Sequence, residues 1–208
     1  MSILEAIGVF AFAISGAVVA MEEKFDLFGI YVMAAITAMG GGILRDAILN
    51  EGLPVFFTSQ WTWGVIFIGA TIAIFLRKNI LNQMVFVIID AIGLAAFAIS
   101  SASTMMEQGQ NKMVILFAAC VTGVGGGMIR DIMANRKPAI FCYDIYAVAA
   151  VLGGLSFIYL CNIWDIGVAI IVSWVITFLV RMFCYLKNVN LPRVKDLIRA
   201  PPFSSPDR

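Results

Sequence analysis

The sequence predicts an all-α integral membrane protein with seven transmembrane helices, arranged as two inverted three-helix repeats plus a seventh helix. Three observations predict this fold. Of the 208 residues, 62% are hydrophobic and only 13% are charged, whereas a soluble domain is about 45–50% apolar and about 25% charged. Seven stretches approach the length and apolarity of a membrane-spanning helix. One sequence pattern also occurs twice, at a fixed offset.

The composition excludes several classes of protein. A soluble fold of this size still exposes about a third of its chain's surface, so it could not bury this much apolar surface. The same figures exclude disorder, collagen and nucleic-acid-binding domains, and the net charge is only +1. The chain has no histidine, hence neither a Ser-His pair nor a His-ligated metal site. We expect no catalytic residues, metal or cofactor, and membrane lipids rather than nucleic acid as surroundings.

The seven expected spans follow one another along most of the chain. They are residues 3–21, 28–50, 61–77, 84–105, 112–134, 143–161 and 163–186. The first stretch has no basic leading region and contains Glu5, so it is typical of a membrane span rather than of a cleaved signal peptide. The third is short, but it starts with Trp61 and Trp63, whose side chains favour the membrane interface.

The basic residues predict the orientation. With the N-terminus on one side of the membrane, eleven Lys and Arg residues fall on the opposite side, and Lys112 alone stays on the N-terminal side. Cytoplasmic loops carry the excess of Lys and Arg, so the N-terminus is expected outside and the C-terminus in the cytoplasm of a multi-pass inner-membrane protein. The polar, proline-containing tail at 187–208 is predicted to be cytoplasmic and mostly disordered.

An internal repeat divides the chain. The motif GGG-x-x-R-D occurs at 40–46 and at 125–131, an offset of 85 residues. The same offset aligns 7–22 with 92–107 without a gap, with ten of sixteen positions identical, and it places Glu5 on Asp90. Each repeat holds three spans, an odd number, so the second copy enters the membrane from the opposite side, as in many transport proteins. The predicted units are residues 1–83, 84–161, 162–186 and the tail at 187–208.

The two glycine triplets allow two interpretations. Glycine weakens a helix by about 1 kcal/mol relative to alanine, and loosened backbone in a membrane must be buried in protein or line water. The freed carbonyls could therefore face a permeating cation, or the glycines could let two helices approach closely. Duplication at inverted depth favours the first interpretation, under which Gly126→Leu reduces K⁺ flux without unfolding the protein. The residues concerned are Gly40, Gly41, Gly42, Gly125, Gly126 and Gly127.

Charged residues within spans usually face a bundle interior or a water-filled cavity. The motifs therefore predict a polar cluster at each end of a pore, although these charges could instead only tie spans together near the interface. Adjacent helical residues do not face each other, so each Arg is expected to pair with a residue other than the Asp next to it. The candidates for pore lining or gating are Arg45, Asp46, Arg130, Asp131, Asp90, Ser15, Ser100, Thr37, Thr122 and Tyr143, the last as a partner of Arg130. A hydroxyl within a span can also bond only the carbonyl four residues before it.

The duplicated GGG-x-x-R-D motif in a seven-span inverted repeat resembles the prokaryotic relatives of the trimeric intracellular cation (TRIC) channels, which are related to a bacterial membrane family labelled as glycine transporters. The resemblance covers about residues 3–186. It implies a homotrimer with one pore per protomer for K⁺ and also Na⁺, in which the second and fifth spans kink at the glycine triplets. The alternative is a secondary transporter for a small zwitterion such as glycine. In that case Arg45 or Arg130 would hold the carboxylate and Asp90 the ammonium.

Overall fold

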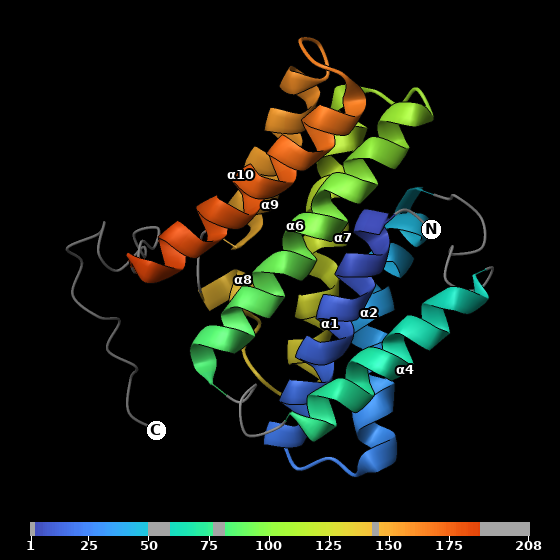
Figure 1. Ribbon diagram of the computed structural model, residues 1–208, viewed down its shortest axis with the longest axis vertical. Coiled ribbons are helices and arrows are strands. Elements are labelled where there is room, and N and C mark those ends of the chain that lie inside the picture. The colour runs from blue at the N-terminus through green and yellow to red at the C-terminus, as the bar shows by residue number, and fades with distance from the viewer. Residues whose placement is uncertain (1–2, 50–58, 77–81, 143–145, 188–208) are drawn as a thin grey trace, which may run out of the picture.

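The computed structural model describes residues 3–49, 59–76, 82–142 and 146–187, and within these ranges the chain is helical, with no strand (Figure 1). The all-α prediction is confirmed. The helices are α1 (Ile3–Glu22), α2 (Leu27–Leu49), α4 (Gln60–Phe75), α6 (Gln83–Glu107), α7 (Lys112–Met133), α8 (Ala139–Cys142), α9 (Tyr146–Leu160) and α10 (Ile166–Leu186). Side-chain caps explain where three of them begin: Asn82, Asn111 and Asp165 accept backbone N–H groups at the starts of α6, α7 and α10.

Five of these helices, α1, α2, α6, α7 and α10, are long and apolar enough to cross a membrane. The other two main helices, α4 and α9, have 16 and 15 residues. They occupy the same place in the two repeats, because the offset of 85 residues maps the range of α4 onto that of α9. The expected boundaries agree with the helices to within a few residues. The largest differences are at the expected starts at 143 and 163, because α9 begins at Tyr146 and α10 at Ile166.

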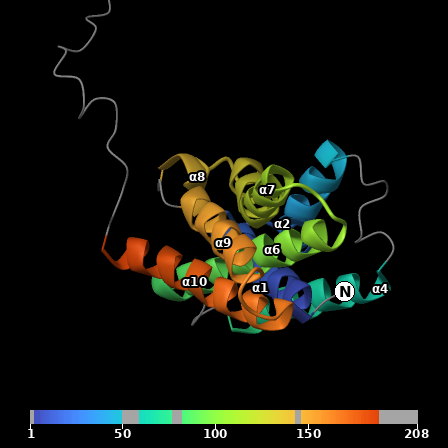
Figure 2. The same ribbon diagram turned by 90° about the horizontal axis from the view of Figure 1, so that it is seen from above.

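The repeat organises the packing. Successive main helices run in alternating directions (Figure 1), and the offset maps α1 onto α6 and α2 onto α7. Helix α1 packs against α2 and α4, as α6 packs against α7 and α9, while α1 contacts α6 and α2 contacts α7 across the two halves. Viewed from above, α4 and α10 lie on the outside of this central group (Figure 2).

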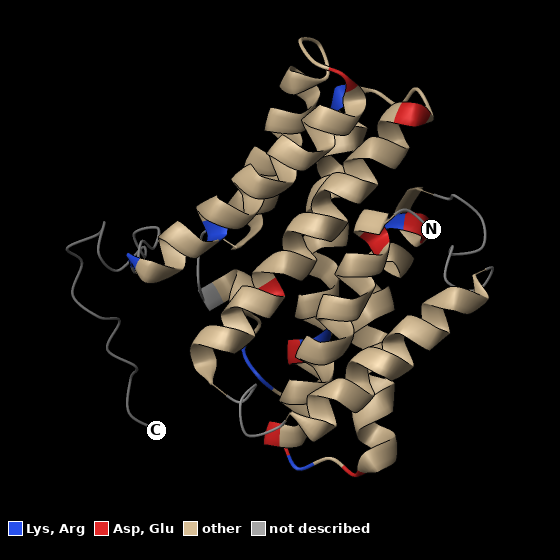
Figure 3. Cartoon of the chain, in the orientation of Figure 1, with Lys and Arg blue, Asp and Glu red and all other residues tan. Residues whose placement is uncertain are grey.

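The bundle is apolar both inside and outside. The buried face of α1 carries small residues, among them the fully buried Ala13, Ala17 and Ala20. Small side chains allow the neighbouring helices to approach α1 closely. Large apolar side chains such as Trp61, Phe75 and Ile171 are exposed on the outer faces. Many of the charged residues lie near helix ends, and a few lie within the bundle (Figure 3). Apolar outer faces combined with a few interior charges are typical of a membrane protein.

Candidate functional site

Helices α2 and α7 cross at the glycine triplets with their backbones in contact. A Cβ atom added to Gly41 would overlap the carbonyl oxygen of Thr122, and one added to Gly126 would overlap the carbonyl oxygen of Thr37. The offset of 85 residues relates Gly41 to Gly126 and Thr37 to Thr122, so the two contacts are equivalent. Glycine is therefore required at the centre of each triplet because the opposing helix occupies the space of a side chain.

The structure corrects the expectation of interrupted helices. All six triplet residues are helical, so their carbonyls stay within hydrogen-bonded backbone. A Cβ on Gly40 would lie 2.8 Å from the Ile129 side chain, and one on Gly125 would lie 3.0 Å from that of Leu44. Close approach of two helices thus explains Gly41, Gly125 and Gly126, whereas a Cβ on Gly40 would meet chiefly the flexible end of the Ile129 side chain. The expectation that Gly126→Leu leaves the fold intact is contradicted, because the backbone at Thr37 blocks the side chain. A permeation role of the triplets stays a prediction.

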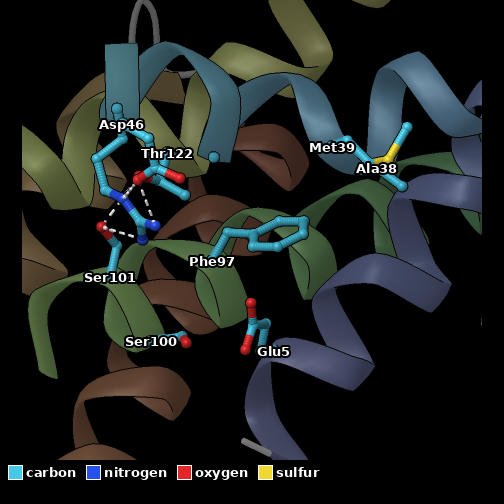
Figure 4. Close-up of a pocket in the computed structure, with 10 residues that line it drawn as sticks. Glu5, Ala38, Met39, Asp46, Phe97, Ser100, Ser101 and Thr122 are labelled. Carbon is cyan, nitrogen blue, oxygen red and sulfur yellow. Dashed lines mark hydrogen bonds and ion pairs between the residues drawn. The ribbon is translucent and has the colours of Figure 1, made fainter. Parts of the chain in front are cut away.

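The third glycines differ from each other. Nothing lies within 4 Å of a Cβ placed on Gly42, whereas one placed on Gly127 would lie 2.8 Å from the Tyr146 hydroxyl oxygen. Gly42 faces a small cavity of about 40 Å³, hereafter the Arg45 cavity (Figure 4). Its lining residues come from α1, α2, α6 and α7. They are Glu5, Ala38, Met39, Gly42, Arg45, Asp46, Phe97, Ser100, Ser101 and Thr122.

Four polar side chains of the Arg45 cavity, those of Arg45, Asp46, Ser101 and Thr122, form a connected group (Figure 4). The guanidinium of Arg45 lies 2.6 Å from Oδ1 of Asp46, which is 3% exposed. It also donates to the Ser101 hydroxyl at 3.4 Å, and Thr122 donates to the same hydroxyl at 3.0 Å. Thr37 instead donates to the Met33 carbonyl four residues before it in the same helix, which is the local alternative considered for these hydroxyls.

A second and larger polar cavity, of about 480 Å³, lies around Arg130 and is hereafter the Arg130 cavity. The guanidinium of Arg130 pairs with Asp90 at 2.6 Å and with Asp131 at 2.8 Å, donates to the Ser15 hydroxyl, and lies over the Phe86 ring. Arg130, Asp90 and Asp131 are all at least nine-tenths buried. Two buried carboxylates therefore share one guanidinium, with α1, α6 and α7 each contributing a polar group.

The prediction that each Arg avoids the neighbouring Asp is wrong. Arg45 pairs with Asp46, and Arg130 with Asp131. The spacing rule concerns the directions of the Cβ atoms, whereas the long arginine side chain folds back and brings its guanidinium to the adjacent carboxylate. Tyr143, the expected partner of Arg130, lies outside the described residues.

The repeat places the same residue types at both cavities. Asp90 corresponds to Glu5, and Ser15 corresponds to Ser100. Glu5 on α1 and Ser100 on α6 line the Arg45 cavity, whereas Asp90 on α6 and Ser15 on α1 bind Arg130. The hydrogen bonding differs, because Arg130 binds Asp90 and Ser15, whereas Arg45 binds Ser101. Eight of the ten predicted polar residues thus lie in two separate clusters, one around Arg45 and one around Arg130, whereas Thr37 bonds only its own helix and Tyr143 lies outside the described residues.

Sequence reasoning missed Arg181 as a cavity residue. It lies on α10, is 6% exposed and lines the Arg130 cavity, with its guanidinium 4.6 Å from the centre of the Tyr146 ring. Its Nε has no hydrogen-bond partner among the described residues. An arginine within the apolar stretch 163–186 is the signal that points to it, but this residue was used only to predict the orientation.

Arg136 lies in the loop after α7 and binds two acidic residues at the C-terminal end of α1. It pairs with Glu22 at 2.8 Å and with Glu23 at 2.6 Å. Partial burial opposes the charge of Arg136, but the hydrogen bonds to these two carboxylates outweigh it, so the pKa of its guanidinium lies above the usual value. All three side chains are about one-third exposed, and such surface pairs contribute about 0–1 kcal/mol.

Comparison with known sequences gives a consistent family. The sequence model of a family described as "Glycine transporter" matches residues 2–78 and 87–162. The UPF0126 membrane protein YvgT of Bacillus subtilis is 43% identical over 159 residues, which cover 74% of this chain and 77% of YvgT. The UPF0126 inner membrane protein YadS of Escherichia coli is 31% identical over 194 residues, which cover 91% of this chain and 93% of YadS.

Solved structures share the fold. A structure described as "Structural basis for conductance through TRIC cation channels" is 34% identical, with a TM-score of 0.82, and the match covers 96% of this chain and 98% of that one. A prokaryotic TRIC channel crystallised in 0.5 M KCl is 30% identical, with a TM-score of 0.83, over 90% of this chain and 96% of that one.

The fold and the paired cavities thus define a multi-pass, all-helical inner-membrane protein with the architecture of the prokaryotic TRIC channels, and the resemblance drawn from the sequence is confirmed. The chain belongs to the family described as "Glycine transporter", and its relatives include UPF0126 membrane proteins.

Proposed function

We propose that this protein is a monovalent cation channel that passes K⁺ and also Na⁺, with one pore in each protomer of a homotrimer and no catalytic activity or cofactor. The observation that supports it most is the pair of repeat-related polar cavities on the two sides of the α2–α7 crossing. Further support comes from the match to TRIC cation channel structures at 34% and 30% identity.

The charges of the Arg45 cavity favour cations over anions, because two acids, Glu5 and Asp46, accompany one Arg there. The Arg130 cavity has four basic and three acidic lining residues, and its two most buried acids, Asp90 and Asp131, flank Arg130. In a low-dielectric interior each excess carboxylate attracts a cation strongly. Hydroxyls that line the Arg45 cavity, such as those of Ser101 and Thr122, would then replace water around the ion, as oxygen atoms do in selectivity filters.

The proposed topology has seven transmembrane helices, with α4 and α9 completing the two repeats. The N-terminus faces outside and the C-terminus faces the cytoplasm. The repeats comprise residues 1–83 and 84–161, the seventh helix 162–186, and the tail at 187–208 lies mostly outside the described residues. On this topology the Arg130 cavity opens toward the cytoplasm, where Arg136 and Lys137 line it.

Current through the purified protein in a planar bilayer tests the proposal. Under a K⁺ gradient we expect discrete openings that reverse near the K⁺ equilibrium potential. Asp90→Asn should lower the K⁺ current several-fold, because it removes a carboxylate from the Arg130 cavity. Asp165→Asn is the matched control, since Asp165 caps the start of α10 and lines neither cavity. A silent bilayer with folded protein, or unchanged current in Asp90→Asn, contradicts the proposal.

A zwitterion carrier is the second candidate, and one observation favours it beyond the family's description. The Arg130 cavity places Arg181, whose Nε lacks a hydrogen-bond partner among the described residues, in the same space as Asp90 and Asp131. A cation and carboxylates in one cavity suit an ammonium and a carboxylate on one small molecule. Saturable counterflow of labelled glycine in liposomes, with a silent bilayer, would establish the carrier; absence of counterflow would exclude glycine as its substrate.

A further inference from the structure

Two phenylalanines related by the repeat meet inside the bundle. Phe12 on α1 and Phe97 on α6 are 85 residues apart, and their ring centroids are 5.2 Å apart with the planes tilted by 49°. Phe12 is fully buried and Phe97 is 7% exposed. Because each ring is the repeat counterpart of the other, their contact lies where the two halves of the inverted repeat meet.

Glycines on three helices make room for these rings. A Cβ on Gly93 would overlap the Phe12 ring, and one on Gly126 would lie 2.9 Å from it. A Cβ on Gly8, the counterpart of Gly93, would lie 3.2 Å from the Phe97 ring. The backbone is thus shaped around both rings, and Gly126 serves the ring contact as well as the crossing of α2 and α7.

The Phe12 ring lies about one helical turn from the Arg130 cluster, which comprises Arg130, Asp90, Asp131 and Ser15. Phe12 precedes Ser15 by three residues on α1, and Gly93, which contacts the ring, follows Asp90 by three residues on α6. Gly126, which also contacts the ring, precedes Arg130 by four residues on α7. One turn of an α-helix advances about 5.4 Å. All three helices that hold the Phe12 ring therefore carry a member of the Arg130 cluster one turn away in sequence.

The Phe97 ring faces the other cavity. Phe97 itself lines the Arg45 cavity, and Figure 4 shows its ring between Glu5 on one side and Ala38 and Met39 on the other. Gly8, on which the ring rests, is three residues from Glu5. The two rings in contact therefore stand between the polar groups of the two cavities.

We propose that the Phe12–Phe97 pair is the hydrophobic barrier that closes the route between the Arg45 and Arg130 cavities, and that opening requires the rings to part. This inference rests on the proposed channel function. An aromatic ring offers a hydrated cation no oxygen in place of its water, and a narrow apolar constriction blocks conduction by excluding water. Phe97 is the ring that moves, because it borders the Arg45 cavity and is less buried than Phe12.

Water permeability and K⁺ flux of proteoliposomes, measured side by side, test the barrier. Osmotic shrinkage in stopped-flow light scattering reports a continuous water path whether or not ions conduct. We expect Phe97→Leu, Phe97→Ala and Phe97→Ser to raise water permeability in that order, with a several-fold increase for Phe97→Ser. Phe157→Ala is the matched control, because Phe157 is likewise a buried phenylalanine but lines neither cavity.

The outcomes separate this inference from the channel proposal. Folded Phe97→Ala and Phe97→Ser proteins with the water permeability of the wild type overturn the barrier, even if the wild type conducts K⁺. Raised water permeability without K⁺ conduction in any variant supports the barrier and defeats the channel proposal. If Phe97→Ala and Phe97→Ser do not fold, Phe97→Leu is compared with Phe157→Leu, and equal water permeability of these two variants overturns the barrier.

Discussion

Gly41→Ala should destabilise the protein severely, whereas Gly42→Ala, one residue further along the same helix, should be tolerated. The alanine Cβ at position 41 would overlap the carbonyl oxygen of Thr122, which is backbone of α7 and cannot rotate away as a side chain could. Overpacking of this kind costs about 1–3 kcal/mol or more. At position 42 the Cβ would meet nothing within 4 Å, and alanine should favour the helix by about 1 kcal/mol.

Thermal melting of the purified variants in one detergent measures this difference. Gly126→Ala is the repeat counterpart and should behave like Gly41→Ala, because its Cβ would overlap the carbonyl oxygen of Thr37. Gly42→Ala should melt at or above the temperature of the wild type. Equal melting temperatures for Gly41→Ala and Gly42→Ala would show that α2 and α7 do not cross in backbone contact.

Much of the fold could be predicted because the repeat is visible in the sequence. Apolar stretches placed the helices to within a few residues, and the offset of 85 residues alone pairs Glu5 with Asp90 and Ser15 with Ser100. Glu5 and Ser100 line the Arg45 cavity, Asp90 lines the Arg130 cavity, and Ser15 accepts a hydrogen bond from Arg130. Interior charges in an apolar span are costly and therefore informative, which is why the charged residues of both motifs were identified as cavity candidates.

The features that could not be predicted from the sequence depend on which helix packs against a given residue. The sequence gives no reason to separate Gly41 from Gly42, because only the position of Thr122 on another helix makes one crowded and the other open. Arg181 has no counterpart in the repeat, so the offset could not point to it. Phe12 and Phe97 stood in matching positions, yet only the inverted packing brings the two rings together.

The second large effect is expected at Arg130. Arg130→Gln should cost about 3–5 kcal/mol of stability, because it leaves the carboxylates of Asp90 and Asp131 buried without their cation. Arg45→Gln should cost less, since the Arg45 side chain is 11% exposed against 3% for Arg130. The measurement is the melting temperature of each variant at neutral pH in the same detergent.

Two further variants show whether buried charge is the cause. Arg136→Gln removes a guanidinium that also pairs with two acids, but at the surface, so its cost should stay within about 1 kcal/mol. Asp90→Asn combined with Arg130→Gln should recover part of the loss, because the asparagine carries no charge to leave unpaired. If Arg130→Gln melts like Arg136→Gln, water reaches the Arg130 cluster freely enough to solvate both carboxylates, and the cluster is part of an open vestibule rather than a buried tie between helices.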